Sequence, residues 1–136
     1  IELEVVESAA LQDISMVSSI IEACHNRNIK VALDDFGTGY TSMGYLKRLP
    51  VTALKIDRSF VGDMEHDDND ALIVNTVTGL AHDLGMTVVA EGVEDGETLI
   101  TLKVIHCDYA QGFHVCHPLP AGDITQWLHD RQSPSL

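Results

Sequence analysis

Polar and charged side chains interrupt or end five short apolar segments of this sequence, a pattern that suggests chemistry before any fold is considered. The residues concerned are Glu4, Asp34 with Asp35, Lys55, Glu91 and Gln111. Buried charges cost free energy unless they are paired or bind a metal ion, so a repeated arrangement of this kind indicates a site rather than coincidence. Carboxylate oxygens without well-placed Cys or His ligands favour hard cations such as Mg²⁺ or Mn²⁺.

Two such ions would suit the hydrolysis of a phosphate ester. Ions a few ångströms apart can stabilise both the attacking and the leaving oxygen of an in-line displacement. The backbone can turn after Leu33 so that one of Asp34 and Asp35 binds an ion directly and the other meets a second ion. Lys55 can orient or activate the attacking water, or neutralise charge on the phosphorus centre. The residue types therefore predict metal-dependent hydrolysis of a phosphate ester.

Short apolar segments alternate with longer segments of helical period, and these elements must position the polar residues. We predict strands at Leu3–Val6, Lys30–Leu33, Ala53–Ile56, Thr87–Ala90 and Tyr109–Phe113. We predict helices at Ile14–Asn26 and Asp70–Leu84, with shorter ones at Thr41–Arg48, Gly96–Val104 and Asp123–His129. Strict alternation of strand and helix predicts an α/β fold with parallel strands and right-handed crossovers.

Two architectures fit that order, an open doubly wound sheet and a (β/α) barrel of the TIM type. In a barrel, the C-terminal ends of all strands converge on one face, where catalytic residues gather. In an open sheet, the same ends spread along a line and converge only near the switch point. Polar residues on five successive strands therefore favour the barrel.

The composition excludes several other classes of protein. The 136 residues include 21 Asp or Glu against 8 Lys or Arg, giving a formal charge of −13, which disfavours binding to a nucleic-acid polymer. Apolar residues make up 45% of the chain, enough for a packed core, yet no apolar run is long enough to span a bilayer. The three cysteines form no paired framework, which suits a reducing compartment.

Several segments resemble the EAL domain family, the bacterial phosphodiesterases that linearise cyclic di-GMP. The segment Asp34–Ser42 reads DDFGTGYTS and is similar to the family signature DDFGTGYSS. Further similar segments are ELEVVES at Glu2–Ser8, LKRLP at Leu46–Pro50, LKIDRSFV at Leu54–Val61, VAEGVE at Val89–Glu94, and QGF through PLP at Gln111–Pro120. The resemblance runs from Glu2 to about Leu128.

This resemblance implies hydrolysis of cyclic di-GMP to linear pGpG with Mg²⁺ or Mn²⁺, in a two-ion site. The roles that it implies are metal binding by Glu4, Asp34 and Asp35, contact with the catalytic water by Lys55, and general-base or water-orienting action by Glu91. Gln111 would support the site from the last strand. Glu94 would anchor the loop Phe36–Ser42 beside the ligand, and Gly37, Thr38 and Gly39 belong to that loop.

One departure limits what the resemblance predicts. The Glu-Ala-Leu triplet that names the family does not occur in this sequence, and the family's Asn ligand lies on another early strand, upstream of Ile1. We therefore expect residues 1–136 to be a single EAL-type domain fragment, the second half of a TIM-type barrel. We expect it to come from a bacterial cytoplasmic protein or the cytosolic part of a larger one, and to be weakly active or inactive alone.

An alternative hypothesis is a catalytically silent module that binds cyclic di-GMP or a protein partner. Another is a short gene product that folds as a half-barrel and has taken a new role. Five parallel strands would leave open sheet edges and expose apolar residues such as Ala32, Leu54 and Val89. We therefore expect association with an N-terminal half of the domain or formation of a homodimer.

Overall fold

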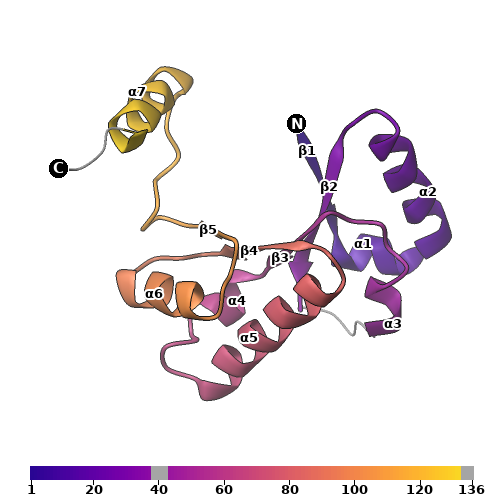
Figure 1. The fold of residues 1–136 in the computed structure, drawn as a ribbon, viewed down its shortest axis with the longest axis horizontal. Coiled ribbons are helices and arrows are strands. Elements are labelled where there is room, and N and C mark those ends of the chain that lie inside the picture. Colours follow the sequence, from indigo (N-terminus) through magenta and orange to yellow (C-terminus); the bar gives the residue numbers. More distant parts are fainter. Residues whose placement is uncertain (38–42, 133–136) are drawn as a thin grey trace.

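A computed structural model describes residues 1–37 and 43–132 of the chain. Five parallel strands form one sheet in sequence order: β1 (Glu2–Val6), β2 (Lys30–Phe36), β3 (Ala53–Ile56), β4 (Thr87–Glu91) and β5 (Tyr109–Gln111). The described helices are α1 (Glu7–Gln12), α2 (Ile14–His25), α3 (Met43–Leu46), α4 (Arg58–Val61), α5 (Asp68–Asp83), α6 (Gly96–Val104) and α7 (Ala121–Gln132). The predicted α/β fold of five parallel strands alternating with helices is confirmed (Figure 1).

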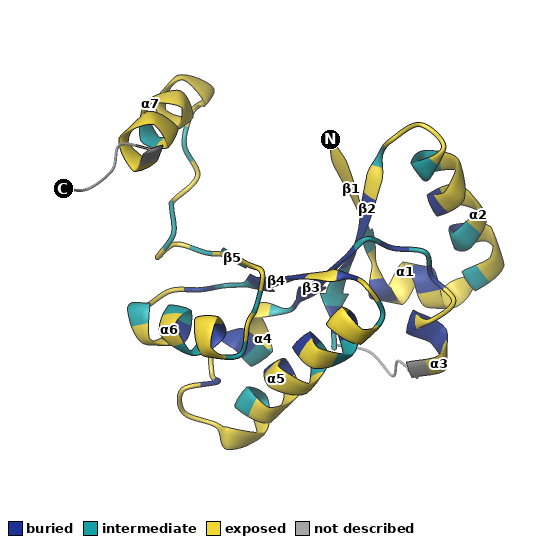
Figure 2. Cartoon of the chain, in the orientation of Figure 1, coloured by how far each residue is buried: buried dark blue, intermediate teal, exposed yellow. Residues whose placement is uncertain are grey.

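The hydrophobic core lies between the sheet and its helices. It includes Leu33, Leu54, Ile56 and Val88 from the sheet, with Ile21, Val74 and Leu102 from α2, α5 and α6. Figure 2 shows the central strands as buried and the outer surfaces of the helices as exposed. Because strand side chains alternate between faces, Lys55, between Leu54 and Ile56, lies on the opposite face of the sheet. The strands that contribute apolar side chains to the core therefore carry their charged residues on the opposite face of the sheet.

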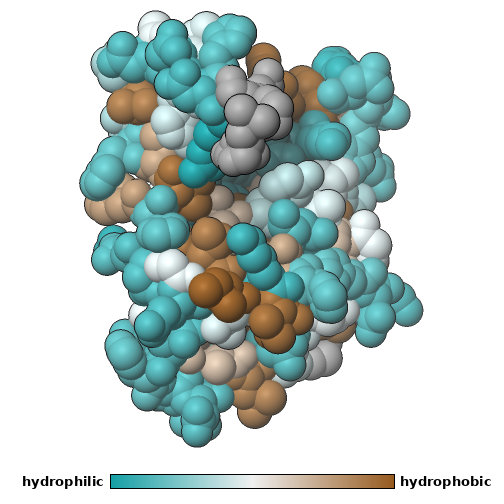
Figure 3. Space-filling view, turned by 60° about the vertical axis from the view of Figure 1, so that its left-hand side comes forward, coloured by the Kyte–Doolittle hydropathy of each residue, from teal (hydrophilic) through white to brown (hydrophobic). Residues whose placement is uncertain are grey.

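The prediction that Ala32 and Leu54 are exposed is wrong, since both are 0% exposed. Leu54 packs into the core, and the short side chain of Ala32 has Glu4 and Ala53 as its partners on the neighbouring strands. Val89 is half-buried. Exposed apolar side chains occur instead on helices and on the two edge strands, among them Leu3 of β1, Tyr109 of β5, Leu72 and Ile100. Figure 3 shows hydrophobic side chains gathered in the middle of one face, with hydrophilic ones around them.

Helix boundaries differ from the predictions mainly at the caps. α5 begins at Asp68 rather than Asp70, because Asp67 Oδ1 accepts a hydrogen bond from Asn69 N at 2.8 Å and caps the helix. The short helices α1 and α4 have no counterpart in the predicted set. The predicted helix Thr41–Arg48 corresponds to α3, and its first two residues lie outside the described residues. α7 extends beyond the predicted Asp123–His129 at both ends.

Three strands end differently from the prediction, at places that matter for the site. β4 continues one residue past Ala90 and includes Glu91. β2 continues past Leu33 through both aspartates. β5 ends at Gln111 rather than Phe113, because the chain there passes against the backbone of Val93. A Cβ atom on Gly112 would lie 2.1 Å from Val93 O, and hydrogen bonds of 3.0 Å join Val93 N to Gln111 O and His114 N to Val93 O. The last strand is therefore short, and it delivers Gln111 beside Glu91.

α7 lies apart from the sheet, at the end of an extended segment that leaves β5 (Figure 1). Arg131 Nη2 donates a hydrogen bond to Val115 O at 3.2 Å, which ties the helix to that segment. Among the described helices, none combines the length and the apolar character that a membrane crossing requires.

Candidate active site

Lys55 forms the centre of the predicted cluster. Its Nζ atom lies 2.8 Å from Glu4 Oε1, 3.0 Å from Asp34 Oδ1 and 2.7 Å from Glu91 Oε1. These partners come from β1, β2 and β4, on both sides of β3. The lysine side chain is 6% exposed, while those of Asp34 and Glu91 are 18% exposed and that of Glu4 is 50% exposed. The structure thus brings these four residues together at one place.

The carboxylates determine the charge state of this lysine. Burial lowers the pKa of the Lys55 ammonium, whereas its hydrogen bonds to Glu4, Glu91 and Asp34 raise it. The three carboxylates outweigh burial, so the pKa lies above its ordinary value. Lys55 is consequently positively charged at neutral pH, and its ammonium group forms ion pairs with three carboxylates.

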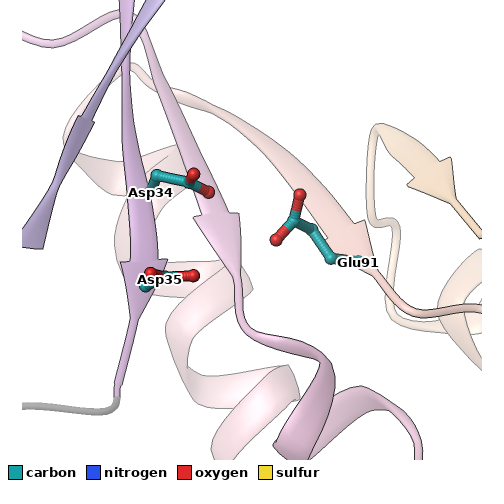
Figure 4. A group of neighbouring side chains, drawn as sticks. All are labelled: Asp34, Asp35 and Glu91. Atoms are coloured by element: carbon teal, nitrogen blue, oxygen red, sulfur yellow. The ribbon is translucent and has the colours of Figure 1, made fainter.

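A local irregularity of β2 brings both adjacent aspartates into the site. In a regular strand, neighbouring side chains would point to opposite faces. Here Leu33 pairs with Leu54 and Phe36 with Ile56, so β2 contains one more residue than β3 over this stretch. Asp35 adopts the left-handed region with φ 56°, a conformation that Asp tolerates better than most residues. As a result, Asp34 and Asp35 both extend toward Glu91 of β4 (Figure 4).

The described residues fit a divalent metal ion at this place. Asp34, Asp35 and Glu91 each offer a carboxylate oxygen, and these three atoms lie within 4.8 Å of one another. Oxygens that bind one Mg²⁺ at about 2.1 Å can lie up to about 4.2 Å apart, so small side-chain rotations suffice. Asp34 Oδ1 is buried, and the ammonium group of Lys55 lies 3.0 Å from it. The set of carboxylate oxygens is the one that hard cations prefer.

A cavity of about 320 Å³ opens beside the carboxylates. Its lining comes from the strand ends and the loops that follow them, and comprises Asp35, Asp57, Arg58, Glu91, Gly92, Glu94, Gln111, Gly112 and Phe113. Gly92 has φ 73°, and a Cβ atom there would lie 2.4 Å from Arg58 Cβ. This close approach lets the chain after β4 pass beside α4, so Arg58 reaches the rim of the cavity. Gln111 lines the cavity and is the partner of Glu91 in the sheet register, while its supporting role stays a prediction.

The loop after β2 is held at its start by a residue that the sequence analysis did not single out. Glu7, at the beginning of α1, is 1% exposed, and its Oε2 atom accepts a hydrogen bond of 3.0 Å from Gly37 N. Gly37 has φ 103°, and a Cβ atom there would lie 2.7 Å from the ring of Phe60. The sequence did contain a signal for Glu7, which is an acidic residue three positions after Glu4, at the point where α1 begins.

The roles predicted for Thr38, Gly39 and Glu94 at the loop after β2 stay predictions. Thr38 and Gly39 lie outside the described residues. Glu94 is exposed at the rim of the cavity, so its anchoring of the loop is still a hypothesis. At the described start of the loop, Gly37 N donates a hydrogen bond to Glu7.

Comparison with known proteins identifies relatives over most of this chain. The sequence profile of the EAL domain matches residues 1–118. "Cyclic di-GMP phosphodiesterase NbdA" of Pseudomonas aeruginosa is 39% identical over 128 residues, which are 94% of this chain and 16% of that protein. The chain therefore spans a small part of the length of this curated relative.

Solved structures of related proteins share the fold of this chain. The structure described as "PaMucR Phosphodiesterase, c-di-GMP complex" is 41% identical, with a TM-score of 0.86 over 90% of this chain and 50% of that chain. The manganese and cyclic di-GMP complex of Klebsiella pneumoniae BlrP1 is 33% identical, with a TM-score of 0.76 over 82% of this chain and 29% of that chain. The chain thus corresponds to at most half of either solved protein.

Proposed function

This chain belongs to the EAL domain family, and we propose that it supplies the C-terminal half of a domain that hydrolyses cyclic di-GMP to linear pGpG. The observation that carries the proposal is the cluster around Lys55, in which Glu4, Asp34 and Glu91 meet within 3.0 Å of one ammonium group. Asp35 joins the same cluster through the irregularity of β2. The similarity to a cyclic di-GMP phosphodiesterase of Pseudomonas aeruginosa and to a solved complex with manganese and cyclic di-GMP supports the assignment.

In this proposal Glu4, Asp34 and Asp35 would hold two Mg²⁺ or Mn²⁺ ions through their carboxylate oxygens. When bound, such ions stabilise the charge on the attacking and leaving oxygens of the phosphodiester. Lys55 donates a hydrogen bond to the attacking water, and Glu91 orients that water or accepts its proton. Gln111, the partner of Glu91 in the sheet register, limits the positions that the Glu91 carboxylate can adopt.

The cavity beside the cluster is where the substrate would lie. Its lining contains carboxylates from Asp35, Asp57, Glu91 and Glu94, so an anionic cyclic dinucleotide would be repelled without divalent ions. We accordingly expect binding of cyclic di-GMP to depend on the metal ion, and a homodimer or an N-terminal half of the domain to complete the walls.

The experiment compares two polypeptides in a turnover assay with cyclic di-GMP and Mn²⁺. One is the 136-residue chain, and the other is a chimera in which this chain follows the N-terminal half of the MucR phosphodiesterase domain. We expect the chimera to produce pGpG and the chain alone to produce little or none. In the chimera, Asp34→Asn should lower the rate at least about 100-fold, because groups that only orient metal ligands already contribute about 10–100-fold.

The control is Asp83→Asn, which removes an exposed carboxylate at the end of α5 and should leave the rate unchanged. Turnover that survives Asp34→Asn would contradict the assigned role of the cluster. A chimera that binds cyclic di-GMP without hydrolysing it would instead favour the catalytically silent module.

A further inference from the structure

The position of Lys55 places a fixed positive charge where a metal ion would have to bind. Its ammonium group contacts Glu4, Asp34 and Glu91 at 2.7–3.0 Å. Two of these residues, Asp34 and Glu91, also belong to the set whose oxygens lie close enough for an ion. The same carboxylates therefore serve two cations.

The two cations interact unfavourably with each other. Asp34 and Glu91 are each 18% exposed and Lys55 is 6% exposed, so water screens their charges only in part. Coulomb interactions over about 4 Å are several times stronger near a protein than in bulk water. A divalent ion on these oxygens must either displace the ammonium group or bind next to it against its repulsion.

The same lysine prevents a second difficulty. Without a positive charge between them, three carboxylates from β1, β2 and β4 would repel one another across β3. Like charges at this separation are destabilising when they are poorly solvated. Lys55 therefore keeps the carboxyl ends of the strands together before any ion binds.

We propose that Lys55 is an internal counter-cation, which pre-assembles the carboxylate cluster and weakens its affinity for divalent metal ions. The inference rests on the proposed metal site, and it concerns a property of the chain apart from turnover. A lysine that only held the cluster together would give the opposite result, because its removal would loosen the cluster and weaken metal binding. Removal of a counter-cation should instead strengthen metal binding.

The test measures Mn²⁺ affinity of the 136-residue chain by electron paramagnetic resonance of free Mn²⁺ and by calorimetry. Lys55→Met removes the charge, and Lys55→Gln removes it while keeping an N–H donor for the carboxylates, in case the methionine variant does not fold. We expect either variant to bind Mn²⁺ at least about tenfold more tightly than the original chain. We also expect a lower midpoint of thermal unfolding without metal and a larger upward shift when Mn²⁺ is added.

The matched control is Lys103→Gln, which removes an exposed positive charge from α6 and changes the net charge equally. Its Mn²⁺ affinity should equal that of the original chain. Unchanged or weaker binding by a folded Lys55 variant would overturn the inference while leaving the proposed function intact. If neither the original chain nor the Lys55 variants bind Mn²⁺, both the inference and the metal site are wrong.

Discussion

Gly112 offers a sharp test of how the end of β5 is packed. An added Cβ atom would lie 2.1 Å from Val93 O and 2.3 Å from Val93 N. Real Cβ atoms do not approach backbone atoms so closely, and a backbone cannot rotate away as a side chain can. Gly112→Ala must therefore move the two segments apart by about 1 Å or more, the distance to ordinary van der Waals contact.

The expected loss of stability follows from the contacts at that crossing. Two backbone hydrogen bonds join the segments, from Val93 N to Gln111 O and from His114 N to Val93 O, and each contributes about 1 kcal/mol. Forcing extra volume into a close-packed site costs about 1–3 kcal/mol. Alanine also restricts the unfolded chain, and this offsets about 0.4–1 kcal/mol of the lost stability. Gly112→Ala should thus lower the free energy of unfolding by about 2–4 kcal/mol.

The assay is urea unfolding followed by far-UV circular dichroism, because Trp127 lies on α7 and its fluorescence would report mainly on that helix. Gly79→Ala is the matched control: Gly79 lies inside α5, and nothing stands within 4 Å of an added Cβ atom. This control should raise stability by about 0.5–1 kcal/mol, from helix propensity. Equal unfolding midpoints for the two variants would refute the reasoning about the crossing at Val93.

Three further predictions concern charge and assembly. Burial raises the pKa of Asp108, but hydrogen bonds of 2.8 Å from His82 Nε2 and Val88 N lower it more. The stability that Asp108 contributes is therefore complete above the ordinary Asp pKa of about 3.9 and is lost as pH falls through the lower folded-state value. Asp108→Asn should cost about 1 kcal/mol at pH 7 in denaturant titrations and progressively less in acid; a constant difference at all pH values would contradict this. Burial, together with the negative charge of Glu7, raises the pKa of Tyr45 to about 12, so Glu7→Gln should lower it in an ultraviolet pH titration, and an unchanged value would contradict the contribution of Glu7. Light scattering of the 136-residue chain should give a dimer burying more than about 1,000 Å², and a stable monomer at tens of micromolar would exclude it.

The sequence by itself determined the order of the strands and the longer helices, the family and most of the residues of the cluster, but not the short helices α1 and α4. Ala53–Ile56 is a short apolar segment, and Asp95 caps the start of the helix Gly96–Val104. Local patterns therefore located this strand and this helix correctly. Glu4, Lys55 and Glu91 stood out because each is a charged residue inside or directly after a short apolar segment, and a buried charge requires a partner. Parallel strand ends lie at one edge of a sheet, and this made their convergence predictable.

Only the tertiary structure decided how those residues meet. The extra residue in β2 places Asp34 and Asp35 on the same side, and it can be recognised only from the pairing of β2 with β3. The contact of Glu7 with Gly37 joins residues thirty positions apart, and the early end of β5 depends on the backbone of Val93. Local sequence patterns report hydrophobic periodicity and capping, whereas strand register, close backbone approach and shared ion pairs arise from contacts between distant segments. That is why the sequence predicted which residues form the cluster, while the fold alone decided that one lysine is shared by three carboxylates.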